Sequence, residues 1–99
     1  MSVLMAKAKI KAEGVADVTA ATKKMFAAIN AAQPEGIRYA SLLHADGQTF
    51  VAMVQLDDGV ENPVRGFPEF RELQEVVDGS RAEPNAVEQW TVVGSYRLF

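Results

Sequence analysis

The sequence predicts an α+β fold in which two helices cover one face of a four-stranded antiparallel sheet. Three observations lead to this class. Residues 37–56 form two extended apolar runs around Asp46-Gly47, which is a strong hairpin signal. Residues 3–11 alternate strictly between two kinds of side chain, which is typical of a strand. Residues 15–32 repeat apolar side chains at helical spacing, which indicates an amphipathic helix.

The first strand has an apolar and a basic side, because successive side chains of a strand point to opposite faces. One face carries Leu4, Ala6, Ala8 and Ile10, and the other carries Met5, Lys7, Lys9 and Lys11. A turn at Glu13-Gly14 leads into the helix, which Pro34 and Gly36 bring to an end.

The hairpin that follows is predicted to close through a two-residue type I′ turn, which requires positive φ at both Asp46 and Gly47. Such a turn sets the register of the two strands. The pairing then begins with Ala45 opposite Gln48, continues with His44 opposite Thr49 and runs down to Ile37 opposite Leu56.

The rest of the chain contains a loop, a helix and a strand. In the loop, Asn62-Pro63 can cap and open a short helical turn. Phe67-Pro68 then starts a helix, which stops at residues 78–80. The predicted fourth strand covers residues 86–93, with a bulge at Gly94 and an extended tail over residues 95–99.

The order strand-helix-strand-strand-helix-strand is the split βαβ, or ferredoxin-like, arrangement. Right-handed crossovers place both helices on the same face of the sheet. The other face, called the bare face below, is predicted to carry Met5, Lys7, Lys9, Arg38, Leu42, His44, Val51, Met53 and Gln55. A bare face with so many large apolar groups indicates an interaction surface.

Composition bounds the function. A chain of 99 residues is expected to form a single domain, residues 1–99, and 48% hydrophobic with 23% charged residues is ordinary for a globular protein. The net charge of −3 argues against a nucleic-acid partner. The lack of cysteine and the single histidine exclude thiolate chemistry and a multi-histidine metal site within one chain. Without an apolar run of membrane-spanning length or a signal-peptide pattern, we expect a cytoplasmic protein with no membrane contact.

Several bare-face residues are candidates for a site. His44 is the one side chain whose ordinary pKa lies near neutrality, so it is either a general base or ligand contact, or a histidine at a surface or interface. Lys7 and Lys9 lie on a predicted central strand. They either meet an anionic partner or pack their stems and hold their amines in solvent.

Arg38 is predicted to lie opposite Gln55, where it can hold a carboxylate or enolate or form a salt bridge to a partner subunit. Six residues separate Arg38 from His44, which is roughly 20 Å at about 3.3 Å per residue. The two therefore meet only across a dimer, or one of them is structural. Trp90, whose facing is ambiguous, and Met53 either fill the core, the favoured interpretation, or line a ligand site.

The chain resembles the dimeric α+β barrels, and within them the small antibiotic-biosynthesis monooxygenase-like proteins. The resemblance lies in the length, the element order, the acidic helix after Asn62-Pro63 and the apolar tail Val92-Val93-Gly94-Ser95-Tyr96-Arg97. It implies a homodimer in which two bare sheet faces form a barrel, with ligands between sheet and helices or inside the barrel. The haem-degrading branch of that superfamily uses a histidine on the second helix, and residues 67–77 contain none.

Two hypotheses of function remain open. The first is a monooxygenase-like enzyme acting on a small aromatic or enolisable substrate without metal or flavin, because the sequence has neither a multi-ligand cluster nor a glycine-rich phosphate loop. His44 and Arg38 are its candidate catalytic residues, and Lys7, Lys9, Met53, Gln55 and Trp90 its candidate ligand-binding residues. The alternative is a non-catalytic small-ligand-binding or structural homodimer. In either case the tail, residues 96–99, is expected to dock on the partner or close the barrel.

Overall fold

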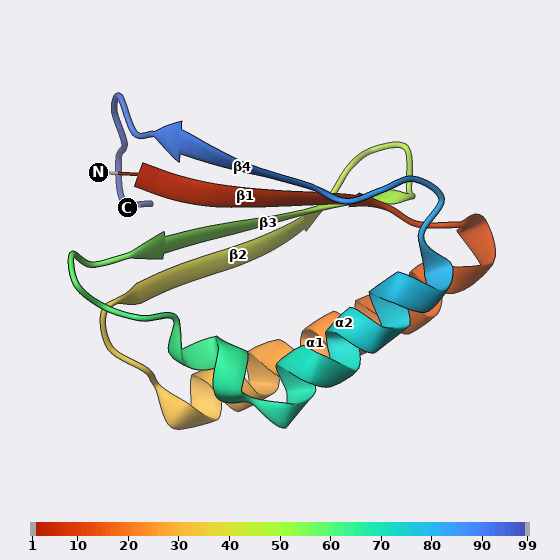
Figure 1. The fold of residues 1–99 in the computed structure, drawn as a ribbon, viewed down its shortest axis with the longest axis horizontal. Helices are drawn as coiled ribbons and strands as arrows, with labels where there is room; N and C mark the ends of the chain where they lie inside the picture. The colour runs from red at the N-terminus through yellow and green to blue at the C-terminus, as the bar shows by residue number, and fades with distance from the viewer. Residues whose placement is uncertain (1, 99) are drawn as a thin grey trace.

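The computed structural model describes residues 2–98, and it confirms the predicted element order (Figure 1). The elements are β1 (Ser2–Lys9), the 3-10 helix η1 (Ala12–Gly14), α1 (Val15–Ala32), β2 (Ile37–Leu43), β3 (Thr49–Leu56), the 3-10 helix η2 (Pro63–Gly66), α2 (Pro68–Ser80) and β4 (Ala86–Thr91). All neighbouring strands are antiparallel, in the order β2-β3-β1-β4. This is the ferredoxin-like α+β fold.

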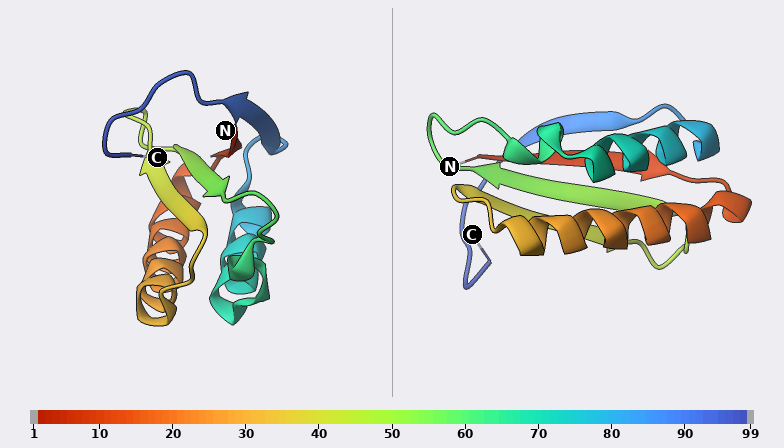
Figure 2. Two further views of the ribbon diagram at one scale, coloured as in Figure 1. Left: turned by 90° about the vertical axis from the view of Figure 1, so that its left-hand side faces the viewer. Right: turned by 90° about the horizontal axis from the view of Figure 1, so that it is seen from below.

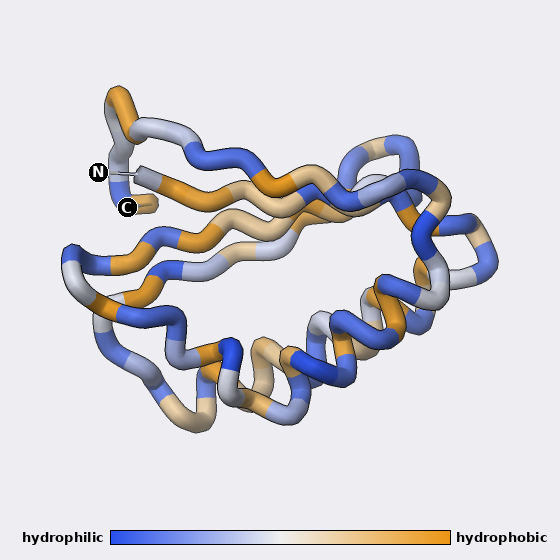
Figure 3. Tube along the Cα trace, viewed as in Figure 1, coloured by the Kyte–Doolittle hydropathy of each residue, from blue (hydrophilic) through white to orange (hydrophobic). Residues whose placement is uncertain are grey.

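Two layers make up the molecule. Helices α1 and α2 lie side by side beneath one face of the sheet, and the opposite face carries no helix of residues 2–98 (Figures 1 and 2). Figure 3 shows the apolar stretches of β1 and β3 running together through the middle of the sheet. The bare face predicted from crossover handedness is therefore present.

The hairpin has the predicted register, with Leu43 opposite Phe50 and Ile37 opposite Leu56, but the predicted turn type is wrong. Positive φ occurs at Gly47 (74°) and not at Asp46. The turn is closed by the amide of Gly47, which donates to the carbonyl of His44 at 2.9 Å. The reason is the Asp46 carboxylate, which satisfies two further loop amides and so stabilises a longer loop than the two-residue turn.

Local capping explains the helix boundaries. Helix α1 has the predicted bounds and ends at Gln33, whose left-handed backbone (φ 48°) lets its amide donate to the carbonyl of Ile29. The Asn62 side chain accepts a hydrogen bond from the amide of Val64 at 3.0 Å, as predicted for the start of η2. Pro68 occupies the first turn of α2, where its missing N–H costs nothing.

The helices are joined to the sheet most closely at one end, called the closed end below. There Ile10 is fully buried and bridges to Arg81, and the amide of Lys11 donates to the carbonyl of Ser80 at 2.8 Å. The predicted strand to residue 11 therefore ends early, at Lys9, because the chain turns to meet α2. The predicted turn at Glu13-Gly14 is the 3-10 helix η1.

The end of the chain differs from the prediction. Strand β4 ends at Thr91, which pairs with Ser2, the first residue of β1. Gly94 is consequently outside any strand, and the predicted bulge and extended tail are wrong for residues up to 98. Phe99 lies outside the described residues. The tail turns back across one end of the bare face (Figure 2).

Candidate functional site

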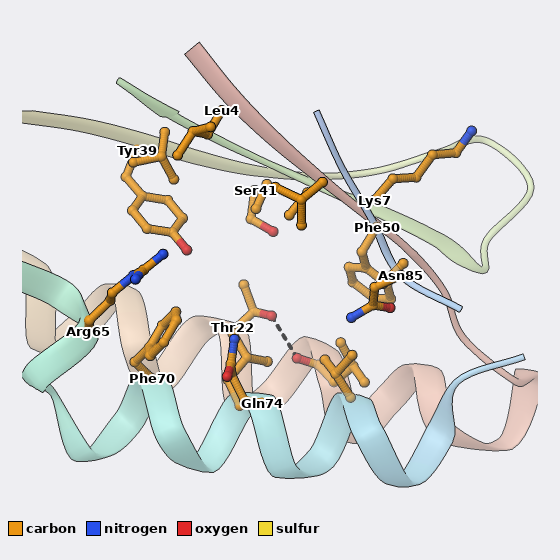
Figure 4. Close-up of a pocket in the computed structure, with 18 of the residues that line it drawn as sticks. Leu4, Lys7, Thr22, Tyr39, Ser41, Phe50, Arg65, Phe70, Gln74 and Asn85 are labelled. Atoms are coloured by element: carbon orange, nitrogen blue, oxygen red, sulfur yellow. Dashed lines mark hydrogen bonds between the residues drawn. The ribbon is translucent and has the colours of Figure 1, made fainter. Parts of the chain in front are cut away.

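A cavity of about 380 Å³ lies between the sheet and the helices (Figure 4). We call it the sheet–helix cavity. Its walls come from all four strands, both helices and the segment around η2: Leu4, Ala6, Lys7, Ala8, Val18, Thr22, Tyr39, Ser41, Phe50, Ala52, Val54, Asn62, Arg65, Phe70, Leu73, Gln74, Val77, Asp78, Asn85 and Val87. A space of this size with mostly apolar walls is typical of a small-molecule site.

Small side chains explain why the cavity exists. The helix-facing positions of the two central strands include Ala6, Ala8 and Ala52, which cannot fill the distance to the helices. Phe50 from the sheet and Phe70 from α2 supply aromatic surface on opposite walls. The cavity therefore suits a flat apolar ligand better than a strongly hydrated one.

Tyr39 brings a polar group into this apolar space. Its ring packs edge-on against Phe26, with the ring centroids 5.3 Å apart and an interplanar angle of 88°. The Tyr39 hydroxyl is protonated at neutral pH, as in any tyrosine, and burial raises its pKa further. The hydroxyl points into the cavity and has no hydrogen-bond partner among residues 2–98 (Figure 4). It is thus free to donate to a ligand.

Arg65 faces Tyr39 from the other wall. In Figure 4 its guanidinium group points toward the Tyr39 hydroxyl. Arg65 forms no ion pair or hydrogen bond through its side chain in the part of the chain that the structure describes. Two unpaired polar groups from β2 and η2 thus converge on one end of the sheet–helix cavity.

Three of the predicted residues come together elsewhere, in an open groove on the bare face. It is lined by Met5, Lys7, His44, Asp46, Thr49, Val51, Glu88 and Trp90. The amide of Asp46 donates a hydrogen bond to Nδ1 of His44 at 3.0 Å. The imidazole lone pair that would accept a proton from a substrate is therefore already engaged in the hairpin loop. The proposed base role of His44 therefore competes with this bond.

The remaining predicted residues lie outside that groove. Arg38 donates to Oε1 of Gln55 at 3.3 Å and lies 3.6 Å from the Asp57 carboxylate, as the cross-strand pairing predicts. Gln55 is only 2% exposed. Lys9 reaches Glu83 at 3.9 Å, and Met53 lies half-buried on the bare face. Arg38 and His44 are at opposite ends of β2, so the structure does not bring the two candidate catalytic residues together within one chain.

The favoured core position of Trp90 is wrong for the single chain. Trp90 lies opposite Val3 on the bare face and is 51% exposed, because β4 is an edge strand that no helix or strand within residues 2–98 covers. Its place in the open groove keeps it as a candidate ligand contact.

Arg65, Gln74 and Asn85 were missed by sequence reasoning. Gln74 had a usable signal, because it lies four residues after Phe70 and three before Val77, where an amphipathic helix should be apolar. A polar side chain on the inner stripe indicates a wet or ligand-lined interior. Arg65 and Asn85 lie in irregular segments whose facing no periodicity reveals.

Comparison with solved structures identifies the fold. Over 95% of this chain, a crystal structure of an antibiotic biosynthesis monooxygenase superposes across its full length with a TM-score of 0.73 at 15% identity. The protein Rv0793 of Mycobacterium tuberculosis matches over 95% of this chain and 96% of its own, with TM-score 0.73 and 19% identity. A Nitrosomonas europaea protein, provisionally named an antibiotic biosynthesis monooxygenase, matches over 95% and 100%, with TM-score 0.74 and 18% identity.

The chain therefore has the fold of the antibiotic-biosynthesis monooxygenase-like proteins, as the sequence resemblance implied. At these identities the likeness concerns the fold alone. No family model matches the sequence, and no curated protein sequence matches it. None of the helices in residues 2–98 is long and apolar enough to cross a bilayer, and the cytoplasmic location stays a prediction.

Proposed function

We propose that this protein is a monooxygenase-like enzyme that acts, without a cofactor, on a small aromatic or enolisable molecule bound in the sheet–helix cavity. One observation carries the proposal: the Tyr39 hydroxyl and the guanidinium of the exposed Arg65, both unpaired within residues 2–98, point toward one another in a largely apolar cavity with aromatic walls. The names of solved structures with the same fold support it.

The chemistry would depend on the substrate. A deprotonated phenol or enol can give an electron to molecular oxygen, and an activated methylene flanked by aromatic rings then becomes a carbonyl. One oxygen atom enters the product, and the other leaves as water with the two methylene hydrogens. The protein would hold the substrate oxyanion with the neutral Tyr39 hydroxyl and limit its contact with water.

The bare face enters the proposal as a homodimer contact. Leu42 and Trp90 are each 51% exposed there, and Val51 lies between Lys7 and Leu42 in the sheet. A second copy packed on this face would cover them, as expected for an exposed apolar patch. The groove that holds His44 and Lys7 would then lie between the two sheets, where a second ligand contact by the predicted residues stays a proposal.

The test is oxygen consumption by purified protein with anthrone and a panel of tricyclic phenols in air. We expect uptake, with labelled oxygen found in the product, and a decrease of about 100-fold for Tyr39→Phe. Tyr96→Phe is the matched control, because Tyr96 is 81% exposed on the tail and lies outside the cavity. Binding of these compounds without any oxygen uptake would instead support the non-catalytic binding dimer.

A further inference from the structure

We propose that Asp58-Gly59, in the loop after β3, is a site of covalent backbone modification, where the aspartate converts to isoaspartate through a cyclic imide. The chain contains three Asp-Gly pairs, at residues 46–47, 58–59 and 78–79. The local chemistry of the three pairs is the same, because a following glycine leaves the backbone amide unhindered. Their surroundings in the fold differ, and among residues 2–98 the second pair alone leaves both reacting groups free.

The reaction joins a side-chain carboxyl carbon to the next backbone nitrogen. The Gly59 nitrogen forms a bond to Cγ of Asp58 while the carboxyl C–O bond breaks, and the amide hydrogen and the carboxyl hydroxyl leave as water. A water molecule then opens the imide ring. Its addition at the side-chain carbonyl restores aspartate, and its addition at the main-chain carbonyl gives isoaspartate. The sequence of steps is a dehydration followed by a hydrolysis, so no oxidant or reductant is consumed.

At Asp46-Gly47 both reacting groups are held by the hairpin loop. The Asp46 carboxylate accepts hydrogen bonds from the amides of Gln48 and Thr49 and from the Thr49 hydroxyl, at 2.7 to 2.9 Å. These bonds favour the ionised carboxylate, whereas the imide forms from the protonated carboxyl, whose hydroxyl can leave. The Gly47 amide donates to the carbonyl of His44 at 2.9 Å. Imide formation here therefore requires the hairpin loop to open.

At Asp78-Gly79 the helix holds the backbone. The Asp78 carboxylate forms an ion pair with Arg81 at 2.7 Å. Gly79 lies inside α2, where backbone amides donate to carbonyls one turn earlier and the peptide planes are fixed. Closing the imide ring requires the peptide plane after Asp78 to turn toward the side chain. The end of α2 would have to unwind before this could happen.

Neither constraint exists at Asp58-Gly59. Asp58 is exposed, and its carboxylate makes no hydrogen bond or ion pair with residues 2–98. The Gly59 amide has no hydrogen-bond acceptor in the same part of the chain. The pair occupies the centre of a turn that the amide of Val60 closes by donating to the carbonyl of Asp57 at 3.0 Å. A Cβ built at Gly59 would meet nothing within 4 Å, so the peptide plane has space to rotate.

The position of this loop gives the modification a structural consequence. The loop leads from β3 to η2, whose cap Asn62 lines the sheet–helix cavity, whereas Asp58 does not. Isoaspartate inserts one additional carbon atom into the main chain and leaves the charge unchanged. The turn closed by Val60 cannot keep its geometry around a longer backbone. Modification at residue 58 therefore changes the connection between the sheet and the cavity wall without altering a cavity residue.

Ageing of the purified protein tests the proposal. The folded protein is incubated at neutral pH for several weeks and digested with chymotrypsin, whose cleavage after Phe50 separates the peptides of Asp46 and Asp58. Isoaspartate in each peptide is measured by enzymatic methylation of its free α-carboxylate and by electron-transfer fragmentation. We expect the Asp58 peptide to be modified at least about 10-fold faster than the other two, since each hydrogen bond that must break lowers the reactive population by roughly 2- to 10-fold.

Two controls separate the fold from the sequence. The same incubation in urea exposes all three Asp-Gly pairs, and we expect similar rates of modification in the three peptides. Asp58→Glu keeps the charge, and it should abolish modification at this position because the larger imide ring forms much more slowly. Thermal unfolding checks that this variant is folded.

Two results would overturn the proposal: an Asp58 peptide that stays free of isoaspartate in the folded protein, or equal rates for the three peptides without urea. Hydrogen exchange gives a second readout. The amide of Val60 should exchange faster in the modified protein than in the fresh protein, and unchanged exchange would refute the effect on the turn. Neither measurement needs a substrate, so both are independent of the proposed oxygenation.

Discussion

In the middle of the two central strands, the two faces of the sheet carry side chains of different size. Toward the helices, β1 and β3 place the small residues Ala6, Ala8 and Ala52, and a cavity remains. Toward the bare face, the same strands place larger groups, such as Met5 and Met53, which face one another across the strand pair. A cavity therefore remains between the sheet and the helices, whereas large apolar side chains lie uncovered on the bare face. We infer that the first serves a ligand and the second a protein partner.

The two faces also differ in whether their cationic side chains form ion pairs. On the bare face, Lys9 and Arg38 each lie near a carboxylate of the same chain. In the sheet–helix cavity, Arg65 has no such partner among residues 2–98. Arg65 is an exposed residue of the cavity wall, so its charge is available to solvent or to a ligand.

The largest expected effect comes from placing the same charge on each face in turn. Val51→Asp puts a carboxylate in the middle of the proposed dimer contact, where an unpaired charge costs on the order of 3–5 kcal/mol. We expect the homodimer to dissociate or unfold, as measured by sedimentation velocity at micromolar concentration.

Val87→Asp is the matched variant on the helix-facing side of the sheet. Val87 is 68% exposed on the edge strand β4 and lines the cavity. We expect unchanged sedimentation and slower oxygen uptake with anthrone and the tricyclic phenols, because the new carboxylate repels the substrate oxyanion. A wild type that sediments as a monomer, or a Val51→Asp variant that stays dimeric, would contradict the assignment of the two faces.

A smaller effect concerns the closed end, which sets how far the helices stand from the sheet. Gly14 is buried, and a Cβ built there would lie 2.5 Å from the Cβ of Ser80. Gly14→Ala is therefore expected to lower the free energy of unfolding by about 1–3 kcal/mol, as overpacking does. Urea denaturation measures this loss.

Gly79→Ala is the control for that substitution. Gly79 lies in α2, and a Cβ built there would meet nothing within 4 Å beyond its own helix and chain neighbours. Alanine should therefore be neutral or stabilise the helix by up to about 1 kcal/mol. Equal stability of the two variants would show that α2 can shift freely at the closed end.

The smallest effect is expected at the hairpin tip, which borders the bare-face groove. The Asp46 carboxylate accepts hydrogen bonds from the amides of Gln48 (2.8 Å) and Thr49 (2.9 Å) and from the Thr49 hydroxyl (2.7 Å). These bonds, first among them the one from Gln48, lower the pKa of Asp46. The stabilisation is therefore present above the unfolded pKa of about 3.9 and is lost as pH falls toward the folded pKa.

Asp46→Ala should accordingly lower the melting temperature at neutral pH, and its difference from the wild type should shrink as pH falls below about 4. Asp58→Ala is the control, because Asp58 is exposed in the loop after β3 and makes no side-chain contact of this kind with residues 2–98. A difference that does not change with pH would mean that the Asp46 carboxylate does not hold the turn.

Local patterns in the sequence were sufficient to predict the elements, their order and the register of the hairpin. Alternation and helical spacing are local properties, and right-handed crossovers leave one way to place both helices. They also placed Lys7, His44 and Val51 on the bare face, where the structure has them. The cap at Asn62 could likewise be predicted from the sequence, because it depends on residues adjacent in the chain.

The places where polar groups meet depend instead on the tertiary structure. The convergence of Tyr39 and Arg65 joins two segments whose separation depends on how far the helices stand from the sheet. That distance follows from the packing at the closed end and from the volumes of Ala6 and Ala52, and periodicity carries no information about either.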